Sequence, residues 1–217
     1  QGNSDLLYDF HYQSQLEFEI AGLGLVNFHA NLTPPFFAWL FVPFSMLPYS
    51  WSFTIWSMLG FIGLYASLKI LRCKQSWRTY LWTLCWFPIF AVISFGQTSI
   101  LTLLVLSLTY LLWKNQYSYL AGLIISLILF KPQLIIGVAI LWLVRYRKDW
   151  KALLGLLTGT ASLGGLTFLF LPEAARSYFN LATKFLPGMI YNEQFPIYHL
   201  HAMRGFWITL FPGMDWL

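Results

Sequence analysis

Long apolar runs, separated by short polar segments, dominate the chain. A bilayer core about 30 Å thick is crossed by about 20 helical residues. The longest runs fit that length, and the shorter ones fit if the turns between them lie in a protein-lined cavity, where irregular backbone is tolerated. The pattern predicts six membrane spans, at residues 51–71, 80–95, 99–113, 119–130, 134–144 and 152–170.

A further apolar run, residues 36–47, is bracketed by Pro34-Pro35 and Pro48 and interrupted by Pro43. Proline stops or kinks helices at such points. We therefore expect a short interfacial or re-entrant helix here. It would join an exterior loop with juxtamembrane helices, residues 1–35, to a transmembrane bundle, residues 36–170.

The composition agrees with a membrane protein. Of the 217 residues 58% are hydrophobic and only 10% are charged, whereas a soluble domain has about 25% charged residues. These values argue against a soluble enzyme, a disordered chain and a nucleic-acid-binding module. The predicted class is all-α, a polytopic transmembrane helical bundle embedded in a lipid bilayer.

The distribution of charge predicts which loops face the cytoplasm. Lys and Arg are absent before Lys69, whereas four carboxylates lie within residues 1–35. Basic residues then cluster in alternate loops, at residues 69–78, at Lys114 and at residues 145–151. Cytoplasmic loops are enriched in Lys and Arg, so these loops are expected in the cytoplasm. This placement explains the net charge of +5 without a nucleic-acid partner.

With this orientation both ends of the chain are expected on the exterior side. An exterior N-terminus requires a preceding helix. We therefore expect a fragment that lacks the first helix and the C-terminal helices of a larger protein. Residues 171–217 are predicted to form an exterior loop and the start of a further helix.

Two exterior polar segments are candidate binding groups. Lys131 interrupts an apolar stretch, and it either extends toward the membrane surface from a helix end or binds an anion such as a phosphate. Gln97, in the turn Gly96-Gln97-Thr98, either serves the turn or donates and accepts hydrogen bonds to a sugar or head group. Because a structural lysine would more often lie in a cytoplasmic loop, the exterior position of Lys131 favours the anion-binding role.

Carboxylates and histidines also collect on this side. Asp5, Asp9 and Glu193 are candidate bases, although solvation in a loop is the more common role of such carboxylates. His199 and His201 lie two residues apart, and no carboxylate completes a metal-binding pattern with them. We predict no metal and no cofactor.

Tryptophans stand at the ends of several apolar runs. Trp and Tyr are enriched at both interfaces of a membrane. We therefore expect Trp51, Trp77, Trp113 and Trp142 in an interfacial belt.

Several short motifs resemble a known family. The segment NLTPPFFA at residues 31–38, continued by FVP and LPY, is similar to the proline-rich segment of glycosyltransferase family 87. The GQTS turn, the sequence FKPQ and a basic loop ending in WKAL follow in the order found in that family, and LYD near the start resembles its first exterior loop. The resemblance covers roughly residues 6–180.

The resemblance implies a GT-C membrane fold and an inverting hexosyltransferase in the plasma membrane, with the active site on the extracytoplasmic side. The family's members include mannosyltransferases that use a polyprenyl-phosphate sugar donor. The acceptor would be a hydroxyl of a lipid-linked or exported glycan. The catalytic base in related enzymes is an aspartate upstream of the LYD-like residues, which leaves Asp5 and Asp9 as second choices.

The resemblance also suggests roles for other residues. Lys131 would bind the donor phosphate, and Gln97 and Gln133 would hydrogen-bond sugar or phosphate. The family's histidine directly precedes Pro-Pro, whereas His29 stands further upstream of Pro34. The remaining substrate-binding candidates are His29, His199, His201 and Arg204.

Two other functions compete with sugar transfer. A multi-pass transporter or lipid flippase should carry ionisable groups at mid-membrane depth, whereas here they stand at segment ends. A non-catalytic membrane scaffold would tolerate an apolar residue in place of Lys131.

Overall fold

The computed structural model describes residues 4–21, 32–73 and 76–185. Every regular element in these ranges is a helix, so the predicted all-α class is confirmed. The chain divides into two compact units, one of residues 1–32 with 172–217 and one of residues 33–171.

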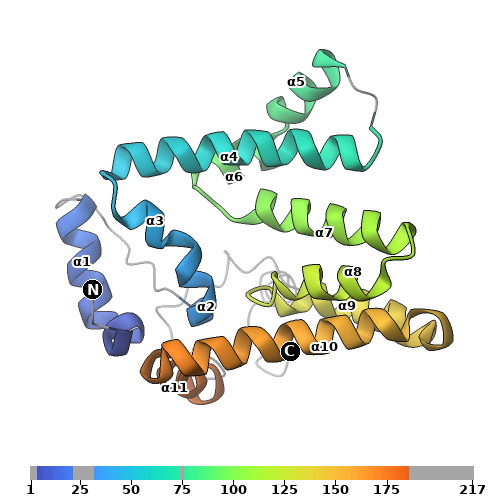
Figure 1. Cartoon of the computed structure of the whole chain (residues 1–217). Coiled ribbons are helices and arrows are strands. Elements are labelled where there is room, and N and C mark those ends of the chain that lie inside the picture. The colour runs from blue at the N-terminus through green and yellow to red at the C-terminus, as the bar shows by residue number, and fades with distance from the viewer. Residues whose placement is uncertain (1–3, 22–31, 74–75, 186–217) are drawn as a thin grey trace, which may run out of the picture. The chain divides into compact units, whose positions relative to one another are not determined.

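The larger unit begins with short helical turns and continues with longer helices (Figure 1). Proline stands in the first turn of several of these helices, where its missing N–H would have no helical partner anyway. Its elements are α2 (Pro35–Ala38), η2 (Trp39–Phe41), α3 (Val42–Ser45), α4 (Tyr49–Ile70), α5 (Trp77–Cys85), α6 (Phe87–Ser94), α7 (Ser99–Lys114), α8 (Ser118–Ser126), α9 (Pro132–Val144) and α10 (Tyr146–Phe170).

Two of these helices, α4 and α10, are long and apolar enough to cross a membrane. A third crossing is possible if α6 and α7 act as one span, bent by 115° between them. The membrane character of the bundle is thereby supported, and the number of six crossings stays a prediction. The apolar run at residues 80–95 is divided into α5 and α6 at Trp86, because Pro88 has no N–H to continue the hydrogen-bond ladder.

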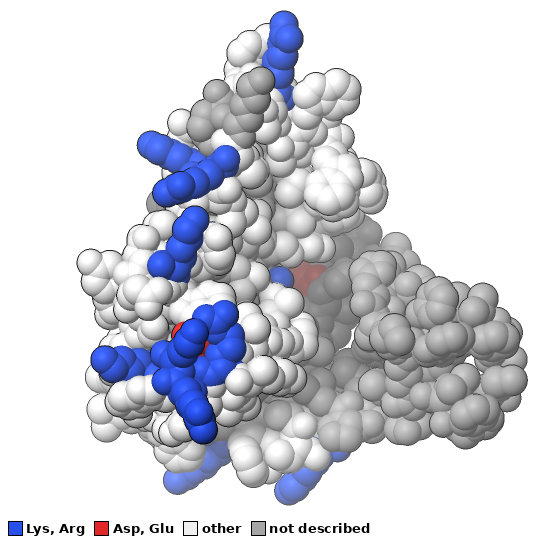
Figure 2. Space-filling view, turned by 90° about the vertical axis from the view of Figure 1, so that its right-hand side faces the viewer, with Lys and Arg blue, Asp and Glu red and all other residues white. Residues whose placement is uncertain are grey.

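Helices α4 and α7 run in the same direction, because the short α5 and α6 lead the chain back between them, and α10 runs in the opposite direction (Figure 1). The loops that follow α4, α7 and α9 therefore lie at one end of the bundle, which we call the basic end. Figure 2 looks at this end and shows Lys and Arg side chains gathered on it. Its described basic residues are Lys69, Arg72, Arg78, Lys114, Arg145, Arg147, Lys148 and Lys151. The clustering agrees with the alternating loops of the sequence, and its placement in the cytoplasm stays a prediction.

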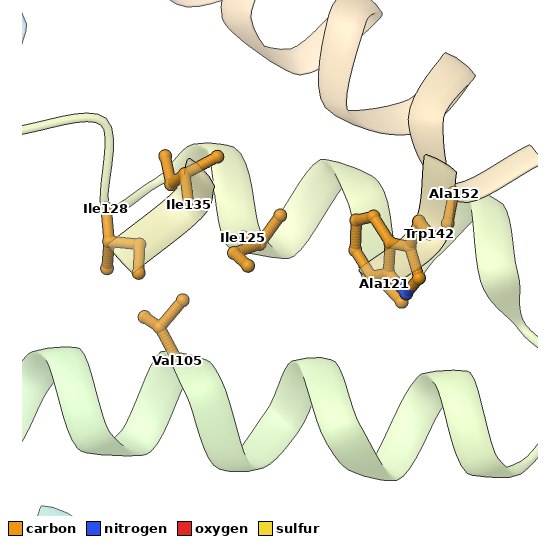
Figure 3. Packing of buried hydrophobic residues seen from close by; sticks show 7 residues of the cluster. All are labelled: Val105, Ala121, Ile125, Ile128, Ile135, Trp142 and Ala152. Carbon is orange, nitrogen blue, oxygen red and sulfur yellow. The ribbon is translucent and has the colours of Figure 1, made fainter. Parts of the chain in front are cut away.

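The core of the unit is formed by side chains of α7, α8, α9 and α10 and of the segment after α8, and Figure 3 shows its buried residues. They are Val105, Ala121, Ile125, Ile128, Ile135, Trp142 and Ala152. Trp142 is 0% exposed, so its prediction as an interfacial residue is wrong: its ring packs edge-on against Trp113 with centroids 6.4 Å apart. Trp51 and Trp77 are 64% and 69% exposed, as belt residues require.

Glycines allow α8 and α10 to approach closely. A Cβ atom at Gly122 would overlap the backbone of Ala152, and one at Gly155 would overlap the backbone of Tyr119. Small residues of this kind permit backbone contact between membrane helices, which association in lipid depends on. The pair α8–α10 is therefore the most closely packed contact of the bundle described here.

The smaller unit contains η1 (Ser4–Tyr8), α1 (Phe10–Ala21), α11 (Pro172–Asn180) and a π-helical turn, Leu181–Phe185. The rings of Tyr8 and Tyr178 lie 5.5 Å apart and join η1 to α11. Burial raises the pKa of both phenols.

Candidate functional site

Lys131 lies at the end of the bundle opposite the basic end, between α8 and α9. Its backbone N–H donates to the carbonyl of Ile128 at 2.8 Å, and Pro132 begins α9 directly after it. The ammonium Nζ donates to Ser99 Oγ at 3.4 Å. The structure thus brings the KPQ segment against the first residue of α7, next to the turn that contains Gln97.

Two stacked aromatic rings lie beneath the Lys131 side chain. Its Nζ lies 5.8 Å from the centroid of the Phe130 ring. Phe130 stacks on Phe37 with centroids 3.9 Å apart, and Phe37 is only 6% exposed. The proline-rich segment, through Phe37 of α2, therefore holds the Phe130 ring next to Lys131. Partial burial lowers the pKa of the Lys131 ammonium.

The turn at residues 96–98 is anchored to α4. Gly96 has a φ of 60°, a conformation that suits glycine, and its carbonyl accepts a hydrogen bond from Trp56 Nε1 at 3.0 Å. The N–H of Gln97 donates to the carbonyl of Val92 at 2.8 Å. The backbone is held on both sides while the Gln97 side chain is exposed. An anchored turn with an exposed amide is suited to binding a polar ligand.

These groups form what we call the Lys131 site. They are three side chains with hydrogen-bonding capacity and one cation, drawn from the starts of α7 and α9. Within the described ranges no ion pair involves Lys131, so its charge is available to an anion. The members of the Lys131 site are Gln97, Ser99, Lys131 and Gln133.

The candidate carboxylates belong to the smaller unit. Asp9 caps α1: its Oδ1 accepts the backbone N–H groups of His11 at 2.9 Å and Tyr12 at 3.0 Å. This is the ordinary task of an aspartate before a helix. Asp5 lies in η1, and its side chain is outside the described part of the chain.

The other predicted site residues lie outside the described residues. They are His29, Glu193, His199, His201 and Arg204.

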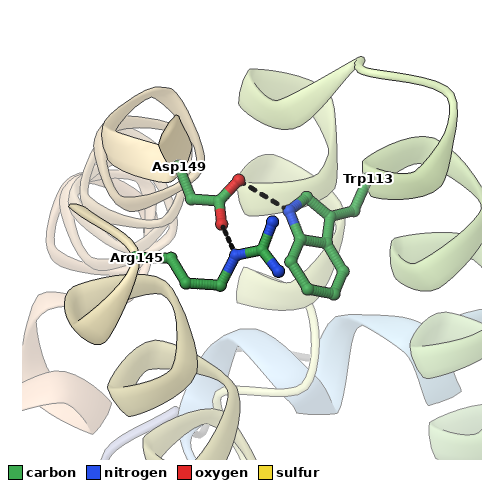
Figure 4. Close-up of polar contacts among 3 residues, drawn as sticks. All are labelled: Trp113, Arg145 and Asp149. Carbon is green, nitrogen blue, oxygen red and sulfur yellow. Dashed lines mark hydrogen bonds and ion pairs between the residues drawn. The ribbon is translucent and has the colours of Figure 1, made fainter. Parts of the chain in front are cut away.

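Three features were not recognised from the sequence. Ser99 and Trp56 hold the Lys131 site together, and Asp149 is the centre of a polar cluster at the basic end (Figure 4). The Asp149 carboxylate accepts Trp113 Nε1 at 2.8 Å and Arg145 Nε at 3.0 Å. The position of Asp149 four residues after Arg145 is a helix ion-pair signal that could have identified this contact.

The comparisons with known proteins support one assignment. The family model described as glycosyltransferase family 87 matches residues 31–213. No curated protein and no solved structure matches the chain. The matched region covers the whole larger unit and therefore the Lys131 site.

Proposed function

Because the chain belongs to glycosyltransferase family 87 and is a membrane glycosyltransferase, we propose that it moves a hexose of the mannose type from a polyprenyl phosphate to a hydroxyl. The acceptor is a lipid-linked or exported glycan. The reaction takes place on the extracytoplasmic side of the plasma membrane, within a fold of GT-C type.

The observation that carries this proposal is the Lys131 cation, which forms no ion pair within the described ranges. Lys131 has a neutral hydroxyl, Ser99 Oγ, as its hydrogen-bond partner at 3.4 Å. A lysine ammonium is a compact charge that suits a phosphate. In the transfer, the acceptor oxygen bonds to the anomeric carbon while the bond from that carbon to the phosphate oxygen breaks. Lys131 then stabilises the negative charge that develops on the leaving phosphate.

The side chains of Gln97 and Gln133 are both exposed, Gln133 two residues after Lys131 and Gln97 two residues before Ser99. An amide both donates and accepts hydrogen bonds, which matches the hydroxyls of a sugar. We assign these two residues to the sugar or phosphate of the donor. His29, His199, His201 and Arg204 are proposed as further contacts to the same substrate.

The base that takes the acceptor proton is an exterior aspartate in this proposal, with inversion at the anomeric carbon. Asp9 caps α1, so that carboxylate has a structural task. Asp5 is therefore the first of the two to test by substitution with asparagine.

The test is sugar transfer by the full-length protein in membranes, with a polyprenyl-phosphate mannose donor. Lys131→Ala should lower the rate by about 100-fold or more, the size expected when one transition-state charge contact is lost. Lys131→Arg should retain part of the activity, because it keeps the charge. The matched control is Lys114→Ala at the basic end, which should transfer at the wild-type rate. Full activity of a folded Lys131→Ala protein would overturn the phosphate role.

A further inference from the structure

The first turns of α10 carry an exposed group of cations. Arg147, Lys148 and Lys151 are all exposed. Their spacing of three and four residues places them side by side on the helix surface. The opposite face of the same turns is buried against the bundle through Asp149 and Ala152. The three cations thus form one outward-facing surface, which we call the α10 basic surface.

No carboxylate neutralises this surface in the described ranges. Asp149 is only 4% exposed and is occupied by Trp113 and Arg145 (Figure 4). The ion pairs found in the described chain do not include Arg147, Lys148 or Lys151. Three positive charges therefore face outward together, and no carboxylate among the described residues pairs with them.

Helix stability does not explain this arrangement. Like charges three or four residues apart destabilise a helix, and cations in a first turn oppose the helix dipole. A partner that carries negative charge would remove both costs. The charge of the surface thus calls for an anionic partner.

The length of α10 indicates where that partner lies. Its 25 residues extend about 37 Å at 1.5 Å per residue, which is longer than a hydrocarbon core of about 30 Å. The other end is apolar and exposed, with Leu169 at 73% and Phe170 at 63%. The excess length is therefore at the start of the helix, at the depth of the lipid headgroups.

Exposed aromatic residues accompany the cations. Tyr146 is 60% exposed and Trp150 is 45% exposed, and Lys151 Nζ lies 5.9 Å from the centroid of the Trp150 ring. Aromatic residues of this kind lie at the headgroup level of a bilayer. Cations and aromatic rings on the same turns fit a lipid surface better than a soluble partner.

We propose that the α10 basic surface binds the headgroups of anionic phospholipids in the leaflet at the basic end. The phosphates contact Arg147, Lys148 and Lys151, and Tyr146 and Trp150 lie between the headgroups. This binding is separate from the sugar-transfer site, because the Lys131 site is at the opposite end of the bundle.

The test measures lipid binding by the full-length protein in detergent, by native mass spectrometry and by the rise in unfolding temperature on adding lipid. Phosphatidylglycerol should bind and stabilise the wild type more than phosphatidylcholine does. The triple variant Arg147→Gln, Lys148→Gln, Lys151→Gln should lose about 100-fold in affinity for phosphatidylglycerol, which is about five-fold for each cation near the surface. Its affinity for phosphatidylcholine should not change.

Two controls distinguish this surface from general electrostatics. Arg147→Lys, Lys148→Arg, Lys151→Arg keeps the charge and should keep the binding. Lys69→Gln, Arg72→Gln, Arg78→Gln removes an equal charge elsewhere on the basic end and should cost less than ten-fold. Equal losses in the two glutamine variants would overturn the assignment to α10.

Two further results would also overturn it. One is equal binding of the two lipids by the wild type, a measurement that needs no variant. The other is tight binding of soluble poly-glutamate by a protein whose lipid binding does not depend on headgroup charge. That result would identify an acidic protein partner. These experiments do not measure sugar transfer. A negative result for lipid binding therefore does not count against the proposed glycosyltransferase function, which has a separate test.

Discussion

At both ends of the bundle a cation lies against an aromatic ring, and Arg145 and Lys131 differ in the group that stands beside their charge. At the basic end the Arg145 guanidinium lies 5.3 Å from the Trp113 ring centroid, and its Nε is 3.0 Å from the Asp149 carboxylate. At the other end Lys131 lies over Phe130, and its hydrogen-bond partner is the neutral Ser99 hydroxyl.

This difference separates a structural cation from one available for binding. The Arg145 cation is paired with the buried Asp149 carboxylate, which also accepts the indole N–H of Trp113, so the cluster joins α7 to the start of α10. A cation beside a hydroxyl keeps its charge for an external anion. The comparison thus supports the proposal that substrate binds at the Lys131 end, and it gives the Arg145–Asp149 pair at the other end a structural role.

The most direct test of this difference is to place a carboxylate next to Lys131. Ser99→Asp would place a negative charge beside Nζ, as Asp149 does for Arg145. Transfer should fall by about 100-fold or more, because the donor phosphate loses its electrostatic partner. The protein should still fold, since aspartate in the first turn of α7 agrees with the helix dipole.

Ser99→Asn is the matched control, because it changes the shape of the side chain similarly without adding charge. It should lose far less activity in the same membrane assay. Equal rates for the aspartate and asparagine proteins would show that Lys131 does not meet the phosphate.

Removal of the Asp149 carboxylate at the basic end should lower stability and leave the specific transfer activity unchanged, the reverse of Ser99→Asp. Asp149→Ala takes away two hydrogen bonds with a charged partner and should lower the free energy of unfolding by about 1.5–3 kcal/mol. Asp149→Asn should lose less, because its carbonyl can still accept from Trp113 Nε1. The measurement is denaturation in detergent, with transfer per folded molecule as the second readout. A fall in that specific activity would contradict a purely structural role.

The sequence allowed much of this organisation to be predicted, because the apolar periodicity and the loop charges are local signals. The all-α class and the gathering of basic loops at one end depend only on where apolar runs stop and which residues follow. Lys131 was identifiable for the same reason, as one charge inside an apolar stretch.

The contacts between segments could not be predicted in this way. Lys131 meets Ser99, and Trp56 meets Gly96, only because α4, α7 and α8 lie together, and such packing depends on side-chain shape. The same reason explains Trp142. A tryptophan near the end of an apolar run can lie at the membrane interface or in the protein core, and packing with Trp113 and Ala121 places this one in the core.

Separation of α8 from α10 should affect both ends together, because α8 leads to Lys131 and α10 begins beside Asp149. Gly122→Ala forces a Cβ into the backbone of Ala152 and should cost about 1–3 kcal/mol, as overpacking does. Gly137→Ala is the matched control, since a Cβ there would meet nothing within 4 Å apart from its chain neighbours and its own helix backbone. Unfolding in detergent should therefore distinguish the two alanine variants, and equal stability would mean that the two helices can move apart freely.

The smallest effect concerns the turn that carries Gln97. Trp56→Phe keeps the ring contact with Phe41, whose centroid lies 5.1 Å away, and removes the hydrogen bond to the Gly96 carbonyl. The loss of about 0.5–1.5 kcal/mol for one neutral hydrogen bond should appear in the transfer reaction as a decrease in kcat/KM of about two- to twelve-fold. Trp51→Phe, at an exposed position on the same helix, should leave kcat/KM unchanged. If the two phenylalanine variants have the same kcat/KM, the anchored turn has no part in positioning the substrate, and the assignment of chemistry to this end would depend on Lys131 alone.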